Sequence, residues 1–256
     1  ELLWAKSTRV SFCHRSCFFS LRMFSSSSFL CFRADYLEAG FNENSKDNLT
    51  ASQHKLTNIG DECSMHNCIG KFLKKYKPGE NLQKPDEEIL NFGRQMLPKE
   101  IVELWEDHGF GAYGDGLIKV VDPRAYRNSL YSWLGRKDLS RIPIIVTAFG
   151  DIFYYRKLAN NENDVSLLNV HYRRTEACGA SYQDFFERYL LDKGVIKKVL
   201  RAELYKQAVK KLGKLDDQDI FFFTPALVLG GGETIKYIEK GNGAVHQMVL
   251  LAIGNQ

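Results

Sequence analysis

No apolar run in this 256-residue sequence approaches the roughly 18–20 residues that a membrane-spanning helix requires. A strong charge imbalance is also missing, because 35 basic residues stand against 31 acidic residues and leave a formal net charge of +4. Domains that bind nucleic acid usually concentrate basic charge on one face, which this near balance does not indicate. We therefore expect neither a membrane nor a nucleic acid as a direct partner.

The sequence also lacks the short motifs that mark common catalytic centres. It contains no G-x-S-x-G, no H-E-x-x-H and no P-loop. Cys178 and His171 have the chemistry of a nucleophile and its base, but the sequence alone does not place them together. After Met65 the only cysteines are Cys68 and Cys178, which is typical of a reduced, cytoplasmic protein without a disulfide framework. We expect no cofactor and no metal.

Residues 1–64 differ in composition from the rest of the chain. The stretch from Leu2 to Ala34 is basic and contains no acidic residue, and serines recur along the segment. This composition fits an organellar transit peptide, or upstream sequence that is disordered or translated outside the functional protein. We favour the second interpretation and expect the functional chain to begin at Met65. A chain that starts at Met65 should then keep the melting temperature of the full sequence.

The rest of the chain is organised around one apolar stretch, I-P-I-I-V-T-A-F-G-D-I-F-Y-Y. Two β-branched and aromatic runs, Ile142–Phe149 and Ile152–Tyr155, have the composition of buried strands. Gly150-Asp151 separates them and suits a tight turn, because glycine tolerates positive φ and aspartate can bond to nearby backbone. The stretch therefore predicts a central β-hairpin.

Periodicity predicts further elements on both sides of this hairpin. Pro98, Asp122 and Ser181 stand where helices begin. Expected helices cover residues 66–76, 86–95, 98–108, 122–134, 181–193, 195–212 and 244–252, and expected strands cover 117–121, 165–172 and 173–178. The fold class is therefore α+β: an antiparallel or mixed sheet flanked by helices, followed by a mainly helical C-terminal subdomain.

Two glycine-rich stretches, Gly109–Gly116 and Gly230–Gly232, allow a different function. A phosphate-binding loop needs a strand before it and a helix N-terminus after it. Around Gly109–Gly116 the expected order is reversed, so a turn into the first strand is the simpler interpretation. A nucleotide- or phosphate-binding enzyme is the alternative function.

Four stretches together resemble a known family combination. They are L-P-K-E-I-V-E-L-W-E-D-H-G-F (Leu97–Phe110), G-D-G-L-I-K-V-V-D-P-R-A-Y (Gly114–Tyr126), I-P-I-I-V-T-A-F-G-D-I-F-Y-Y (Ile142–Tyr155) and F-F-F-T-P-A-L-V-L-G-G (Phe221–Gly231). In this order they resemble a bacterial GAD-like domain, expected at 65–180, joined to a type VI secretion immunity-protein C-terminal domain, expected at 181–256. Nothing before Met65 takes part in the resemblance.

The resemblance implies a non-catalytic protein that binds a cognate secreted toxin and protects the cell that makes it. Because such toxins are notably DNases, we expect acidic side chains to meet a basic toxin cleft. Candidate toxin-binding residues are Asp107, Asp115, Glu162, Asp164, His171 and Arg173. For His171 and Arg173 a solvated strand end is the simpler alternative. An interaction domain without any toxin partner is the other alternative.

Overall fold

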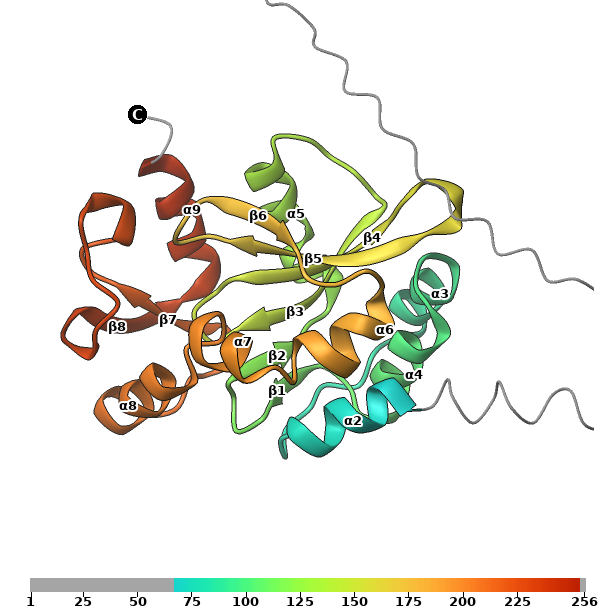
Figure 1. The fold of residues 1–256 in the computed structure, drawn as a ribbon, viewed down its shortest axis with the longest axis horizontal. Helices are drawn as coiled ribbons and strands as arrows, with labels where there is room; N and C mark the ends of the chain where they lie inside the picture. Colours follow the sequence, from blue (N-terminus) through green and yellow to red (C-terminus); the bar gives the residue numbers. More distant parts are fainter. Residues whose placement is uncertain (1–66, 254–256) are drawn as a thin grey trace, which may run out of the picture. The chain divides into compact units, whose positions relative to one another are not determined.

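A six-stranded antiparallel sheet forms the centre of the structure, a computed structural model that describes residues 67–253 (Figure 1). The expectations for residues 1–64 lie outside the described residues. The strands follow sequence order, each paired with the next: β1 (Gly111–Tyr113), β2 (Ile118–Val120), β3 (Arg141–Thr147), β4 (Ile152–Lys157), β5 (Asn163–Asn169) and β6 (Arg174–Ala177). With helices on both faces, this confirms the α+β fold and makes the sheet antiparallel.

The central hairpin is β3 and β4, as the sequence predicts. Gly150 adopts φ +84°, which only glycine takes easily, and it carries the turn between the two strands. The side chain of Thr147 accepts hydrogen bonds from the backbone N–H groups of Phe149 and Asp151, at 3.3 and 3.1 Å. The turn is therefore held from inside the protein rather than left in solvent.

Side chains that alternate along β4 feed two separate cores. Phe153 and Tyr155 belong to the larger core, whereas Ile152 and Tyr154 belong to the smaller one. This alternation is the period of two that a strand imposes. Both faces of the sheet are buried here, which explains why the strand is apolar and aromatic from Ile152 to Tyr155.

The larger core is covered by helices from both ends of the described chain. They are α2 (Asn67–Lys75), α3 (Glu87–Met96), α4 (Lys99–Asp107), α6 (Tyr182–Asp184) with the π-helical turn Phe185–Tyr189, α7 (Lys193–Lys198) and α8 (Ala202–Leu212). Two helices, α5 (Pro123–Leu134) and α9 (Gly243–Ile253), cover the smaller core through Leu130 and Leu250. None of the helices described between residues 67 and 253 is long and apolar enough to cross a membrane.

The predicted helix over 195–212 is wrong as a single element. The chain forms α7 and α8 instead, separated at Arg201, whose backbone is left-handed with φ +51°. Gly194 does not end a helix as expected but lies inside α7, because Asp192 caps that helix by accepting from the Val195 N–H at 2.9 Å.

The C-terminal region also contains a second, two-stranded sheet that the sequence did not reveal. Its strands are β7 (Asp219–Phe223) and β8 (Ile238–Asn242), which pair antiparallel. Short 3-10 turns occupy Leu227–Leu229 and Ile235–Tyr237 between them, and a further one lies at Ala159–Asn161. Within the apolar run 220–229 (I-F-F-F-T-P-A-L-V-L), β7 is mostly buried, whereas Val228 and Leu229 are exposed.

Candidate functional site

Three of the predicted toxin-binding residues carry exposed carboxylates. Asp107 ends α4, Asp115 lies in the turn between β1 and β2, and Glu162 lies in the connection between β4 and β5. The β4–β5 connection and the β1–β2 turn lie at different ends of the sheet (Figure 1). The structure therefore does not gather these residues into one cluster.

Two of the predicted residues are not available at the surface. Asp164 pairs with Arg156 across β4 and β5, with Nε donating to its carboxylate at 2.7 Å, and it is buried. His171 is fully buried, and its Nε2 donates to the carbonyl oxygen of Phe149 at 2.7 Å. We correct the expectation for both, because a buried and bonded side chain does not meet a partner protein.

Arg173 is half-buried and already has partners within the chain. Its guanidinium donates to the Leu250 carbonyl at 2.8 Å and stacks over the Trp133 ring at 5.2 Å. It therefore stabilises the C-terminal end of α9, whose last carbonyls have no helical partners.

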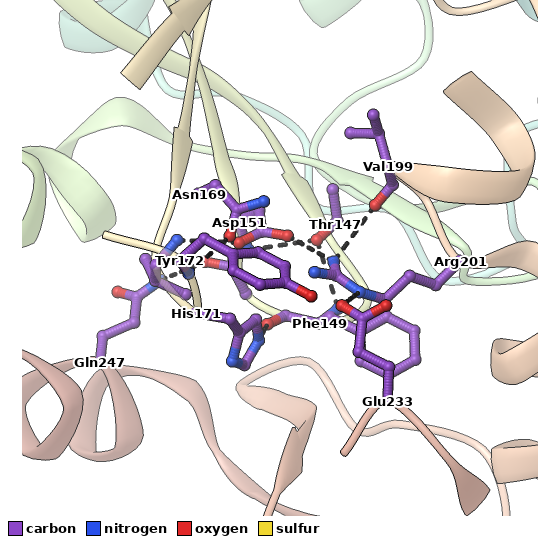
Figure 2. A network of polar contacts seen from close by, with 12 residues as sticks. Thr147, Phe149, Asp151, Asn169, His171, Tyr172, Val199, Arg201, Glu233 and Gln247 are labelled. Carbon is purple, nitrogen blue, oxygen red and sulfur yellow. Dashed lines mark hydrogen bonds and ion pairs between the residues drawn. The ribbon is translucent and has the colours of Figure 1, made fainter. Parts of the chain in front are cut away.

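A polar network that the sequence does not indicate surrounds the β3–β4 turn (Figure 2). Arg201 donates to Asp151 at 2.7 Å and to Glu233 at 2.9 Å. The second oxygen of Asp151 accepts from the Val170 N–H at 2.9 Å, so both of its carboxylate oxygens are bonded. The guanidinium also lies over the Phe149 ring at 5.4 Å. This network joins the hairpin to the C-terminal region.

Three more contacts hold the same turn, one from α9 and two from β7. Gln247 of α9 donates to the Gly150 carbonyl at 2.7 Å, and Phe221 of β7 donates its N–H to the Ala148 carbonyl at 2.8 Å. The rings of Phe149 and Phe223 stack with centroids 5.6 Å apart. The turn that looked like a simple reversal is thus the point where the C-terminal region joins the sheet.

The electrostatics of this network favour a structural role. Burial acts to lower the pKa of Arg201, but the charges of Asp151 and Glu233 outweigh it and leave the pKa raised. Burial lowers the pKa of His171, and it lowers the pKa of the neighbouring His246 to about 4. Both rings are therefore neutral at pH 7, and the guanidinium of Arg201 keeps its positive charge.

The structure gives little support to Cys178 as a nucleophile or to the glycine-rich stretches as phosphate-binding loops. Burial raises the pKa of the Cys178 thiol to about 12, which is the opposite of nucleophile activation. A side chain at Gly109 would meet the Gln83 carbonyl oxygen at 2.6 Å, and one at Gly231 would meet the Pro225 carbonyl oxygen at 1.9 Å. Close backbone packing therefore accounts for these two glycines. Within residues 67–253, no group of three or more His, Cys, Asp or Glu side chains is placed to hold a metal ion.

One groove combines apolar walls with carboxylates, and we call it the acidic groove. It lies between α2 and α4, has a volume of about 370 Å³, and has Asp107 at its edge. Its lining comprises Ile69, Gly70, Leu73, Glu100, Glu103, Leu104, Glu106, Asp107 and His108. Glu103 and Glu106 already pair with Lys99 and Arg94, so the exposed Asp107 is the carboxylate best placed to meet a positively charged partner.

Comparison with known proteins assigns the two parts of this structure. Residues 67–169 match the GAD-like domain, and residues 180–253 match the C-terminal domain of the T6SS immunity protein Tdi1. The fold resembles the crystal structure of Atu4351 from Agrobacterium tumefaciens, with a TM-score of 0.56 and 18% identity over 71% of this chain and 87% of that chain. No curated protein matches the sequence. The described chain is therefore similar to a GAD-like domain followed by a type VI secretion immunity-protein C-terminal domain, which confirms the resemblance found in the sequence.

Proposed function

We propose that this protein binds and neutralises a toxin of a type VI secretion system, in the cytoplasm of the cell that makes the toxin. The match of residues 180–253 to an immunity-protein domain carries this proposal. The role needs no catalysis, because a tight complex that covers the toxin's working surface suffices. Such complexes depend on a few well-placed anchor residues rather than on every contact.

We further propose that the toxin is a DNase and that it presents basic residues to this protein. The acidic groove supports this, because it places the exposed carboxylate of Asp107 beside apolar walls. Asp107 is the first candidate contact. Asp115, Glu162 and Arg173 stay as further candidates on other parts of the surface, whereas the buried Asp164 and His171 are left out.

Co-expression tests the function directly. The full chain is expressed in a bacterium together with the toxin-like product of the neighbouring gene, and survival is compared with cells that carry the toxin alone. We expect survival and a complex that purifies as one species. Death of the cells together with separate elution of the two proteins, while this protein is shown to be folded, would contradict the proposal.

Charge reversal tests the surface. We expect Asp107→Lys to weaken toxin binding by about tenfold or more, because it places a cation where the toxin is expected to present one. Glu239→Lys is the matched control, since Glu239 is exposed on β8, away from the acidic groove. Affinity is measured by titration calorimetry at two salt concentrations, and the difference should shrink as salt rises. Equal affinities of the two variants would remove Asp107 from the interface.

A further inference from the structure

A second groove lies on the opposite side of the sheet, between α5 and α9. Its volume is about 490 Å³, and its lining contains no charged side chain. Trp133 and Ser132 form the α5 wall, and Met248 and Leu251 form the α9 wall. We call this space the apolar groove. The apolar groove is separate from the acidic groove.

The helix beside this groove is unusual for one that faces water. Residues 243–253, which form α9, include no Asp, Glu, Lys or Arg. Three of its large apolar side chains are nevertheless well exposed: Val245 at 61%, Met248 at 70% and Val249 at 47%. We call this exposed apolar face the α9 ridge. A face of this kind normally marks an interaction surface.

The groove is also rigid. The fully buried side chain of Gln247 donates to the Gly150 carbonyl and accepts from the Ser129 hydroxyl at 2.8 Å, so it fixes α9 to both the hairpin and α5. Arg173 stacks on Trp133 and bonds to the last carbonyls of α9. The walls are thus held in place before any partner arrives, which lowers the entropic cost of docking.

We propose that the occupant of the apolar groove is the α9 ridge of a second copy of this chain, which makes a two-fold symmetric dimer. Ridge and groove share Met248, so a two-fold axis beside this residue places the ridge of each copy against the groove of the other. A two-fold contact brings each surface against itself, and like charges would then oppose one another. The uncharged α9 face can meet a second copy of itself without this repulsion. The acidic groove would oppose carboxylates to carboxylates, and α8 would oppose lysines to lysines.

The size of the contact between the two copies determines how tightly we expect them to associate. Helices of 11 and 12 residues are each roughly 16–18 Å long, which places the contact at the small end of specific interfaces. We therefore expect reversible dimerisation that rises with protein concentration.

The test is light scattering during size-exclusion chromatography of the full chain under reducing conditions, across a wide range of concentrations. We expect the mass to rise from 29.3 kDa towards twice that value. Met248→Glu should weaken association on the order of a hundredfold, because it buries an unpaired carboxylate. Met248→Leu should keep the dimer, because volume and polarity are retained.

Leu158→Glu is the matched control. Leu158 is exposed in the β4–β5 connection, at the far end of the sheet from α9 (Figure 1), so this variant should dimerise like the wild type. If Met248→Glu fails to fold by circular dichroism, Ser132→Arg on the α5 wall gives the same measurement. A full chain that stays at 29.3 kDa at every concentration overturns the proposal. It is equally overturned if the charged variants associate like the wild type, or if they lose only toxin binding from a monomeric protein.

Discussion

The carboxylate of Asp151 shows how one residue joins distant parts of this chain. It lies in the turn of the central hairpin, yet it is fully buried, and it pairs with Arg201, which is itself only 4% exposed. Removing one partner of a buried ion pair leaves the other charged and desolvated, which costs far more than the pair contributes in place. Asp151 and Arg201 should therefore be judged together.

We expect Asp151→Ala to lower the free energy of unfolding by about 3–5 kcal/mol, because Arg201 is left without its main counter-charge. The double variant Asp151→Leu with Arg201→Met should recover much of this loss. Glu203→Ala, which breaks an exposed pair with Lys206, should cost under about 0.5 kcal/mol. Urea denaturation measures all three, and a loss below about 1 kcal/mol for Asp151→Ala would show that the pair does not carry the junction.

The buried His171 and its half-buried neighbour His246 predict a dependence of stability on pH. Burial, with a smaller contribution from His171, lowers the pKa of His246 from its ordinary 6.5 to about 4. Between these values the unfolded chain binds a proton and the folded chain does not, so the unfolding free energy falls as pH drops through the window. The contribution is fully present above pH 6.5.

His246→Phe should flatten this dependence, because the new ring keeps the stack on Phe222 and cannot bind a proton. We expect the wild type to lose on the order of 2 kcal/mol more than the variant between neutral pH and pH 4. Chemical denaturation at a series of pH values gives both curves. Parallel curves would mean that His246 does not titrate in this range.

At the scale of elements, the sequence predicted most helices and the hairpin but not the break between α7 and α8. Nothing local opposes a continuous helix around Arg201, and a left-handed backbone there costs roughly 1–2 kcal/mol. We infer that the ion pair of Arg201 with Asp151, a partner far away in sequence, offsets this cost. A distant partner also explains why the sequence did not indicate that Asp164 is buried. Its partner, Arg156, lies on the neighbouring strand, and the pairing depends on strand register. The exposure of Asp107 could be predicted without knowing any distant partner, because a charged residue at a helix end is usually solvated.

Lys119 joins two elements by a different device. Its ammonium group donates to the backbone carbonyls of Asp216 and Asp217 at 2.7 Å and of Asp219 at 3.0 Å, which fixes the segment before β7 onto β2. Burial lowers its pKa, and the nearby carboxylates partly offset this. The ammonium group of Lys119 therefore satisfies three backbone carbonyl oxygens at once.

We expect Lys119→Met to cost about 2–3 kcal/mol, because it keeps the side-chain volume and leaves three carbonyls without their donor. Lys240→Met is the control: Lys240 donates to a single carbonyl, that of Lys214, at an exposed position, so the loss should stay below about 0.5 kcal/mol. Thermal unfolding compares the two. Similar losses would indicate that water replaces the ammonium group without penalty.

At the scale of the whole molecule, the two matched segments share one core. Phe149 lies in the first segment and stacks on Phe223 in the second, and both belong to the larger core together with Phe72. The expected division at residue 180 therefore separates two family matches but not two independent cores. We infer that both segments unfold together.

A chain that ends at Ala180 tests this inference. It should fail to give a cooperative unfolding transition and should bind a hydrophobic dye, because Phe149 and Phe153 would lose their cover. The full chain should show one transition by calorimetry, with equal calorimetric and van't Hoff enthalpies. A truncated chain that melts cooperatively would show that the first segment folds alone.

The junction at the β3–β4 turn also limits how such proteins can be recombined. A C-terminal segment transferred onto another GAD-like domain would bring Arg201 and Gln247 with it, and these need an aspartate and a free carbonyl in the recipient's turn. Without that aspartate the hybrid would bury an unpaired guanidinium. Exchange of toxin specificity between relatives is therefore easier through substitutions on the exposed surface than through a swap of whole segments.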